Sequence, residues 1–279
     1  MTYLLSHLPE LWPWLILMAA LGVGWSGSKP VALVLLGVWA CAAVYLGILT
    51  TAALAVAILG LALAAWLRNA TGTAAAIGWA VLILWSVAMG AHLVPGFNNP
   101  IALDAVLSGP ESGPFTMHLN ADKPLVFFAL LLAWRPLLHQ DRPARIVPLL
   151  MTAALALVLF PIAVAAGALL PEVSWPAWIG LFVLVNLLMT CLTEEAFFRG
   201  FLQKALIERI GTAGGIAAAS LLFGLVHFPA GAAVVAFATL LGAACGLGHW
   251  YGGRLRYAVW IHFGFNLIHL LFFTYPGPA

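Results

Sequence analysis

The chain has 279 residues, of which 64% are hydrophobic and only 7% are charged. A soluble domain carries about 25% charged residues, so this chain has too few charges to cover a water-facing surface. Its formal net charge of +2 comes from scattered basic residues, which exclude the electrostatic footprint expected for nucleic acid. Composition therefore predicts an all-α, polytopic bundle of transmembrane helices whose surroundings are the lipid bilayer.

The N-terminal third is almost uniformly apolar. The first ten residues contain no Lys or Arg, whereas a cleavable signal peptide needs a basic n-region, so Leu11 to Trp25 is interpreted as a retained first span. Residues 31–67 contain no charged residue. One helix of that length would measure about 55 Å against a hydrocarbon core of about 30 Å. Two helices joined by a turn near Leu49 to Thr51 fit better.

Apolar runs divide the whole chain into about eight to ten spans, because each span needs roughly 20 apolar residues. The expected spans lie near 11–27, 31–48, 50–67, 73–94, 123–139, 146–170, 176–203, 212–228, 231–250 and 257–274. The longest polar stretch, near 95–122, is rich in Pro, Gly, Asn and Ser and is expected to form an extramembrane loop with at most a short interfacial turn. Four-residue spacings of glycine, at Gly242 and Gly246, indicate a close helix contact.

Basic residues sort to one side of the expected spans. With ten spans and the N-terminus outside, the positive-inside rule is satisfied, because only Lys123 falls outside. The residues that fall inside are Lys29, Arg68, Arg135, Arg142, Arg145, Lys204, Arg209, Arg254 and Arg256. This arrangement predicts that the loop at 95–122 is external and that residues 134–145 are cytoplasmic.

Charged side chains inside an apolar stretch mark residues 190–203. Glu194 and Glu195 follow a long apolar run, and Arg199 comes four residues after Glu195. A charge at the bilayer centre costs at least ~2.5–3.5 kcal/mol, so such residues need partners or a function. The i,i+4 spacing predicts an ion pair between Glu195 and Arg199, and Glu194, about 100° away around the helix, is a candidate general base. The alternative is an interfacial helix end at the headgroups.

Two later apolar stretches also carry polar residues. His227 ends the stretch LLFGLVH, and a lone histidine in such a place usually has a structural role. His262 and Asn266 are four residues apart on the last span, so they share one face of the helix. Polar groups in an apolar environment need hydrogen-bond partners, which leaves both a structural pair and a functional site open.

Taken together, two Glu, one Arg, two His and one Asn lie on three apolar helices in the last third of the chain. A carboxylate and a histidine can activate a water molecule. A second histidine and an asparagine can donate hydrogen bonds to a developing oxyanion, which are worth ~2.7–4 kcal/mol per donor. The set therefore predicts a hydrolytic site that uses no serine or cysteine nucleophile.

These residues resemble the three motifs of the CAAX-protease and bacteriocin-processing (CPBP, or Abi) family of intramembrane proteases. The family pattern is EExxxR, FxxxH and HxxxN on successive helices. Here the motifs run from Glu194 to Arg199, from Phe223 to His227 and from His262 to Asn266. The resemblance implies a protease core at 145–279, and it leaves 1–144 as N-terminal transmembrane spans of unknown role that include the loop near 95–122.

The resemblance also implies roles for individual residues. An intramembrane endopeptidase of this kind would hydrolyse a peptide bond of a membrane-associated protein or peptide, here expected in the bacterial inner (cytoplasmic) membrane. Glu194 would be the general base, His227 would help to bind and activate water, and His262 and Asn266 would form the oxyanion hole. Glu195 and Arg199 would hold the geometry of the site.

The cofactor and the class of protein have alternatives. Two Glu and two His could bind zinc, which accepts nitrogen and oxygen ligands, but the sequence has no HExxH motif and an asparagine is a poor fourth ligand. We therefore favour a glutamate-type mechanism without a cofactor over a metalloprotease. A transporter would use the same buried Glu and His to carry protons or ions, although few polar residues precede residue 94. A non-catalytic membrane scaffold is the other alternative.

Overall fold

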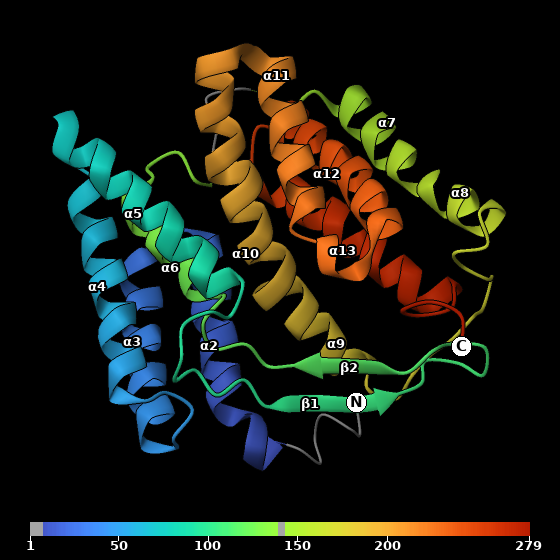
Figure 1. The fold of residues 1–279 in the computed structure, drawn as a ribbon, viewed down its shortest axis with the longest axis horizontal. Coiled ribbons are helices and arrows are strands. Elements are labelled where there is room, and N and C mark those ends of the chain that lie inside the picture. The colour runs from blue at the N-terminus through green and yellow to red at the C-terminus, as the bar shows by residue number, and fades with distance from the viewer. Residues whose placement is uncertain (1–7, 139–142) are drawn as a thin grey trace. The chain divides into compact units, whose positions relative to one another are not determined.

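The computed structural model describes residues 8–138 and 143–279 (Figure 1). Helices dominate the described residues, as expected for this composition. The α-helices are α2 (Leu8–Ser26), α3 (Lys29–Tyr45), α4 (Thr51–Leu67), α5 (Gly72–Gly90), α6 (Leu125–Ala133), α7 (Ile146–Leu157), α8 (Leu159–Ala165), α9 (Ile179–Leu184), α10 (Leu192–Glu195), α11 (Lys204–Leu225), α12 (Ala232–Gly252) and α13 (Leu255–Phe272). Two π-helical segments, η1 (Val185–Cys191) and η2 (Ala196–Gln203), and one 3₁₀ turn, η3 (Phe228–Ala230), complete the helices.

Five helical stretches of the described chain are long and apolar enough to cross a membrane, and three shorter apolar helices precede them. The long stretches are Gly72–Gly90, Ile146–Ala165, Ile179–Leu225, Ala232–Gly252 and Leu255–Phe272, and the shorter ones are Leu11–Ser26, Lys29–Tyr45 and Thr51–Leu67. The predicted all-α membrane bundle is confirmed. The predicted turn between the second and third spans is also present, between Tyr45 and Thr51.

The polar stretch at 95–122 is more ordered than predicted. It contains a two-stranded sheet formed by β1 (Ile101–Val106) and β2 (Phe115–His118), whereas the sequence analysis expected a loop without strands. The segment between the strands, residues 107–114, contains two Ser, two Gly and two Pro, which are turn-forming residues. This turn brings the two short, more apolar runs into a pair.

The expected span at 123–139 is wrong in its extent. The helix in this region, α6, has only nine residues, which rise about 14 Å and cannot cross a hydrocarbon core of about 30 Å. Eight of its nine residues are buried, and α6 packs against α2, α4 and α5. A helix that is apolar on all sides belongs in an interior, so α6 is a core helix. The last residue of the expected span lies outside the described residues.

The expected span at 146–170 is interrupted. It divides into α7 and α8, which meet at Val158. Pro161 lies in the first turn of α8, and a proline removes a backbone donor and clashes with the carbonyl four residues earlier, here that of Leu157. The interruption of the helix follows from this clash.

The expected spans at 176–203 and 212–228 are present as two helical parts that are joined at Gly211 without an intervening loop. The chain runs without a loop from α9 through η1, α10 and η2 into α11. Gly211, with φ of 77° and ψ of 170°, produces a kink inside α11. A residue with a side chain would be strained in this left-handed region, so the predicted change of direction is present but is made by a single glycine.

Contacts divide the chain into two compact units that do not follow the sequence order. The first consists of Met1–Leu103, Met117–Arg135 and Gly180–Thr193, and the second of Asp104–Thr116, Pro136–Ile179 and Glu194–Ala279. In the second unit α12 packs against α7, α11 and α13, which lie side by side in Figure 1. The division at residues 144 and 145 that the sequence analysis expected stays a prediction.

The second unit has loops at two opposite ends of its helices. At one end the Arg145 amide donates to the Tyr251 carbonyl, just before α13 begins. At the other end the Gly113 amide donates to the Gly277 carbonyl, just after α13 ends. The turn between β1 and β2 and the segment before α7 therefore lie at opposite ends of α13, as the predicted topology requires.

The sidedness of these ends can be measured by cysteine labelling. We expect Asp104→Cys to react with a membrane-impermeant maleimide in intact cells, and Glu208→Cys to react only after permeabilisation. Both positions are exposed in the structure, so accessibility on each side is not limited by packing. The background should carry Cys41→Ser, because Cys41 is the one exposed native thiol among the described residues. The reverse labelling pattern would show that the topology is inverted.

Candidate active site

A buried ion pair lies at the centre of the candidate site. Glu195 ends α10 and Arg199 lies one turn later in η2, and neither side chain is exposed. Arg199 Nη1 donates to Glu195 Oε1 at 3.2 Å, as the i,i+4 spacing predicted. Arg199 Nη2 also donates to the Gly242 carbonyl of α12 at 2.9 Å. The guanidinium therefore links the helix that carries the glutamates to α12.

The same carboxylate holds the first residue of the third motif. His262 on α13 places Nδ1 2.8 Å from Glu195 Oε1, and the histidine side chain is buried. Because an ionised carboxylate can only accept hydrogen bonds, this contact assigns the ring hydrogen to Nδ1. The Nε2 edge of the ring is then the edge available for chemistry.

Phe223 on α11 connects the remaining motif residues. Its buried ring lies under the Arg199 guanidinium, 4.3 Å from ring centroid to Cζ, within the range of cation–π attraction. The centroid of the same ring is 4.9 Å from that of His227 and 5.6 Å from that of His262. His227 Nδ1 is 2.8 Å from the Phe223 carbonyl oxygen. Phe223 thus forms an apolar wall between the two histidines.

The positions of the two other predicted site residues, Glu194 and Asn266, follow from the site residues that lie beside them on α10 and α13. Glu194 immediately precedes the buried Glu195 and is itself only partly buried. Asn266 lies one helical turn after His262 on α13, so both face the same side of that helix, and it is also partly buried. Both side chains are thus more accessible than the ion pair beside them.

The local backbone explains how one helix presents these groups. Glu194 and Glu195 lie between the π-helical segments η1 and η2. A π-helical turn inserts an extra residue, changes the direction of the following side chains and is frequent at functional sites. The two widened segments therefore rotate the α10 carboxylates relative to the apolar residues before and after them.

Residues 176–268 match the Rce1-like family, described as type II CAAX prenyl endopeptidase Rce1-like.

This segment contains all three motifs, so the resemblance to the CPBP family that the sequence indicated is confirmed there. The match supports the interpretation of this segment as part of a membrane peptidase whose substrate is a membrane-associated protein. The match covers 93 of the 279 residues, counted from 176 to 268. Neither a curated protein nor a solved structure matches the chain.

Two buried residues of the Rce1-like segment were missed by the sequence analysis. Gln203, the last residue of η2, has a fully buried side chain, and its Nε2 donates to the Gly246 carbonyl at 3.0 Å. Cys245 on α12 is fully buried and interacts with Glu195. Gln203 had a detectable signal, because it follows Arg199 by four residues in an apolar stretch. Cys245 had none, because a buried cysteine is usually a small core residue.

The residues of the Rce1-like segment do not fit a metal site. Among residues 8–138 and 143–279, no three His, Cys, Asp or Glu side chains come together as metal ligands would. Glu195 Oε1 already accepts hydrogen bonds from both Arg199 and His262. A protein zinc site needs at least three ligands of these types.

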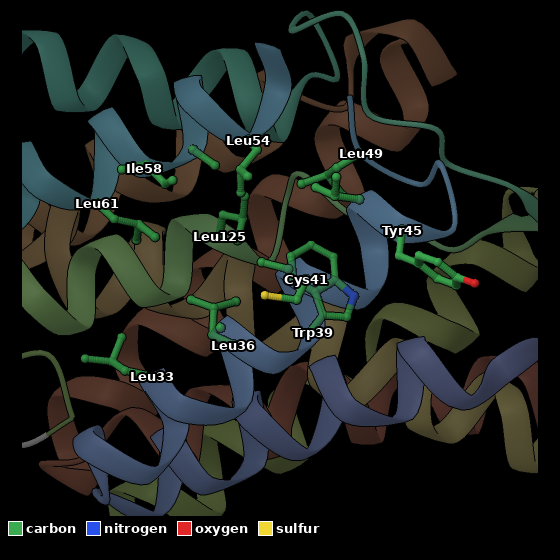
Figure 2. A pocket seen from close by; sticks show the side chains of 14 residues that line it. Leu33, Leu36, Trp39, Cys41, Tyr45, Leu49, Leu54, Ile58, Leu61 and Leu125 are labelled. Atoms are coloured by element: carbon green, nitrogen blue, oxygen red, sulfur yellow. The ribbon is translucent and has the colours of Figure 1, made fainter. Parts of the chain in front are cut away.

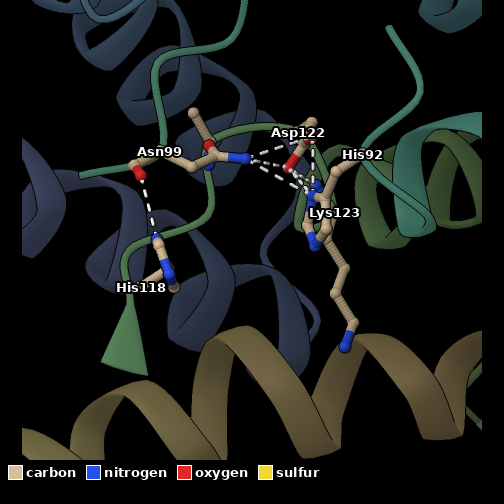
Figure 3. Close-up of polar contacts among 6 residues, drawn as sticks. His92, Asn99, His118, Asp122 and Lys123 are labelled. Atoms are coloured by element: carbon tan, nitrogen blue, oxygen red, sulfur yellow. Dashed lines mark hydrogen bonds and ion pairs between the residues drawn. The ribbon is translucent and has the colours of Figure 1, made fainter. Parts of the chain in front are cut away.

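A second polar cluster lies outside the Rce1-like segment, in the first compact unit. Asp122 is buried, and His92 Nδ1 lies 2.9 and 2.8 Å from its two carboxylate oxygens (Figure 3). The Asn99 side chain donates to the same carboxylate, and the His118 ring is held on the Asn99 carbonyl. His92 follows α5 with φ of 57°, a conformation that costs a residue with a side chain. The cluster fixes the end of α5 and is a structural anchor.

The same unit contains an apolar groove of about 710 Å³ between α3 and α4. Figure 2 shows its lining, which includes Leu36, Trp39, Leu54 and Leu125. Acidic side chains, histidines and amides are absent from this lining. Cys41 and Tyr45 are part of the lining, but no carboxylate or histidine lies there to activate the thiol or a water molecule. The chemistry-bearing cluster is therefore that of the Rce1-like segment.

The buried ion pair makes a prediction about stability. Arg199→Met leaves Glu195 without its charged partner in the interior, and removing one member of a buried pair costs about 3–5 kcal/mol. Adding Glu195→Gln removes the stranded charge, so the double variant should recover most of this loss. The measurement is denaturation of the purified protein in detergent.

Arg209→Met, at an exposed arginine of α11, is the matched control and should change stability by only about 0.5 kcal/mol or less. A double variant that is less stable than Arg199→Met alone would contradict the pairing.

Proposed function

We propose that this protein is an intramembrane endopeptidase that hydrolyses a peptide bond of a membrane-associated protein or peptide. The observation that carries the proposal is the buried contact between Glu195 and His262, because it joins the first and third motifs of the Rce1-like segment at one point. Burying this polar contact among apolar helices is costly, and a catalytic site is a physical reason for retaining it.

In the proposed reaction Glu194 is the general base. Its carboxylate takes a proton from a water molecule that is also bound by His227, and the water oxygen forms a bond to the scissile carbonyl carbon. The carbonyl oxygen becomes an oxyanion, which Asn266 and His262 stabilise by hydrogen bonds. His262 acts here as an imidazolium, because both ring nitrogens must carry hydrogen if Nδ1 donates to Glu195 and Nε2 donates to the oxyanion. Breakage of the carbon–nitrogen bond follows, and the proton held by Glu194 passes to the leaving amine.

Glu195 and Arg199 are positioning residues in this proposal. Glu195 orients the imidazole of His262 through Nδ1, and Arg199 holds Glu195 while it is itself held by the Gly242 carbonyl. Such support matters because a donor in an oxyanion hole must be preorganised at 2.7–3.1 Å from the position that the oxyanion will occupy.

The surroundings suggest the class of substrate. Apart from His227, which follows α11, the motif residues lie on helices that are long and apolar enough to span a membrane. The scissile bond therefore has to reach the site from the bilayer or its surface. A substrate with a membrane anchor near the cleaved bond satisfies this requirement. We place the protein in the bacterial inner (cytoplasmic) membrane and propose that the reaction uses no cofactor. The support for this is that, among the described residues, no three side chains of metal-ligating types are grouped together.

Replacement of the proposed base tests the assignment. Glu194→Gln keeps the size of the side chain and removes the base, so cleavage should fall by about 10²–10⁴-fold, while folding is retained. Asn266→Ala should cost less, about 10²–10³-fold for one oxyanion donor. The assay is mass spectrometry of products formed by purified protein in detergent or vesicles from a lipid-anchored peptide and from membrane proteins. Unchanged cleavage by Glu194→Gln would remove Glu194 from the mechanism.

The same pair of variants separates a peptidase from the transporter suggested as an alternative. A transporter would produce no peptide termini with either protein, but it would lose proton or ion flux in vesicles after Glu194→Gln. A scaffold would show neither cleavage nor flux. Arg199 is unsuitable for this comparison, because it is a buried support of Glu195 and its loss would alter the fold in every case.

Metal dependence is tested separately. Treatment with a chelator, followed by removal of the chelator, should leave the cleavage rate within about twofold if a glutamate and two histidines activate the water. The measurement is the initial rate before and after treatment, with the total zinc content of the same sample determined in parallel. Loss of activity that is restored by added zinc would establish a metalloprotease.

A further inference from the structure

Two side chains of η2 bond to two glycine carbonyls of α12 in the same register. Arg199 donates to Gly242 and Gln203 donates to Gly246, at 2.9 and 3.0 Å. Both donors are fully buried, and each donor and its acceptor are separated by 43 residues. Because both pairs advance by four residues in the same direction, η2 and α12 run parallel past this contact.

Glycines at the two acceptor positions leave room for the side chains that bond to them. A Cβ atom at Gly242 would lie 2.9 Å from Arg199 Nη2, and one at Gly246 would lie 2.6 Å from Gln203 Oε1. Both distances are shorter than a non-bonded Cβ contact tolerates. Small residues at this spacing let helix backbones approach closely in a membrane, and here the space is filled by polar side chains from the neighbouring helix.

Gln203 is an expensive residue at this position. Its Nε2 has a partner, but its buried Oε1 has no hydrogen-bond partner among the described residues. An unsatisfied buried acceptor costs about 1–3 kcal/mol, and an apolar side chain of the same shape would avoid that cost. Stability alone therefore does not explain why residue 203 has an amide side chain. A role in fixing the rotation of η2 does explain it.

We infer that Gln203 is a positioning residue that, together with Arg199, docks η2 on Gly242 and Gly246 and so fixes the orientation of the α10 carboxylates. One bond would allow η2 to pivot, and two bonds one turn apart prevent rotation and sliding. The inference rests on the proposed function for its effect on catalysis, but the docking itself can be measured without any substrate.

The experiment compares Gln203→Met with wild type by activity, by stability and by the histidine spectrum. We expect kcat to fall by about ten- to a hundredfold, as for a small misplacement of catalytic groups, with little change in KM. The stability of the variant should equal or exceed that of wild type. In ¹⁵N-histidine NMR the His262 ring signal, identified with a His262→Asn variant, should shift although residue 203 is not a hydrogen-bond partner of His262.

Two controls address packing. Thr152→Val removes a buried side-chain hydrogen bond that stays within its own helix, to the Pro148 carbonyl, and should leave kcat and the His262 signal unchanged. Gly180→Ala, the second control, adds a methyl group on α9 where nothing lies within 4 Å and should likewise leave both unchanged.

Gly246→Ala should destabilise the protein. Combining it with Gln203→Ala should restore stability but not kcat, because the shorter side chain at residue 203 removes the clash and the docking bond together.

The outcomes separate the two proposals. Full activity of Gln203→Met, or equal losses of stability and activity, would overturn the positioning role. If wild type cleaves none of the substrates, the proposed function fails, and the His262 signal alone decides the docking. An unchanged signal in Gln203→Met would then contradict the inference, and a shifted signal would support it.

Discussion

A carboxylate and a guanidinium that are both shielded from solvent each need several partners, and this requirement organises the second compact unit. Glu195 and Arg199 are fully buried, and a buried pair is stabilising only if further hydrogen bonds satisfy the rest of each group. Glu195 Oε1 and both terminal nitrogens of Arg199 have such partners, whereas Glu195 Oε2 and Arg199 Nε have none among the described residues. The partners come from three other helices: a phenylalanine ring from α11, a glycine carbonyl from α12 and an imidazole from α13. The pair thus selects which helices can be neighbours.

The chemistry and the packing are consequently parts of one arrangement. The phenylalanine of the second motif lies under Arg199 and contacts both motif histidines, and the histidine of the third motif closes the contact with Glu195. Aromatic rings supply apolar area and also accept the charge of a guanidinium on their faces. The second motif therefore needs its phenylalanine as well as its histidine, which lies two residues beyond the end of α11 and contacts the Phe223 carbonyl through Nδ1.

The compact unit that holds the site extends beyond the segment that matches the family. It also includes α7, α8 and the turn between the two strands. Glu172 accepts a hydrogen bond from the Glu111 amide at 2.8 Å and one from the Ser112 hydroxyl. Through these bonds the turn is attached to the segment between α8 and α9. A chain segment that is distant in sequence thereby completes the polar end of the unit.

The sequence by itself determined the membrane class, the approximate positions of the helices and the ion pair between Glu195 and Arg199. These follow from composition and from spacing along one helix, which are local properties. It also indicated the resemblance to the family whose model matches residues 176–268, because three motifs occur in order on apolar stretches. The full span expected at 123–139 is wrong, and the strands within the loop expected at 95–122 were not predicted. Both cases concern segments whose apolar or polar character does not fix their length or pairing.

Only the tertiary structure decided which groups the buried charges contact. Spacing within η2 indicates that Arg199 can reach Glu195, but it cannot indicate that the other guanidinium nitrogen donates to Gly242, or that Gln203 repeats this contact one turn later. The four-residue glycine spacing predicted a close approach of helices without naming the partner. Hydrogen bonds between helices depend on register and rotation, which are set by the packing of the whole unit and are not encoded in the periodicity of any one segment.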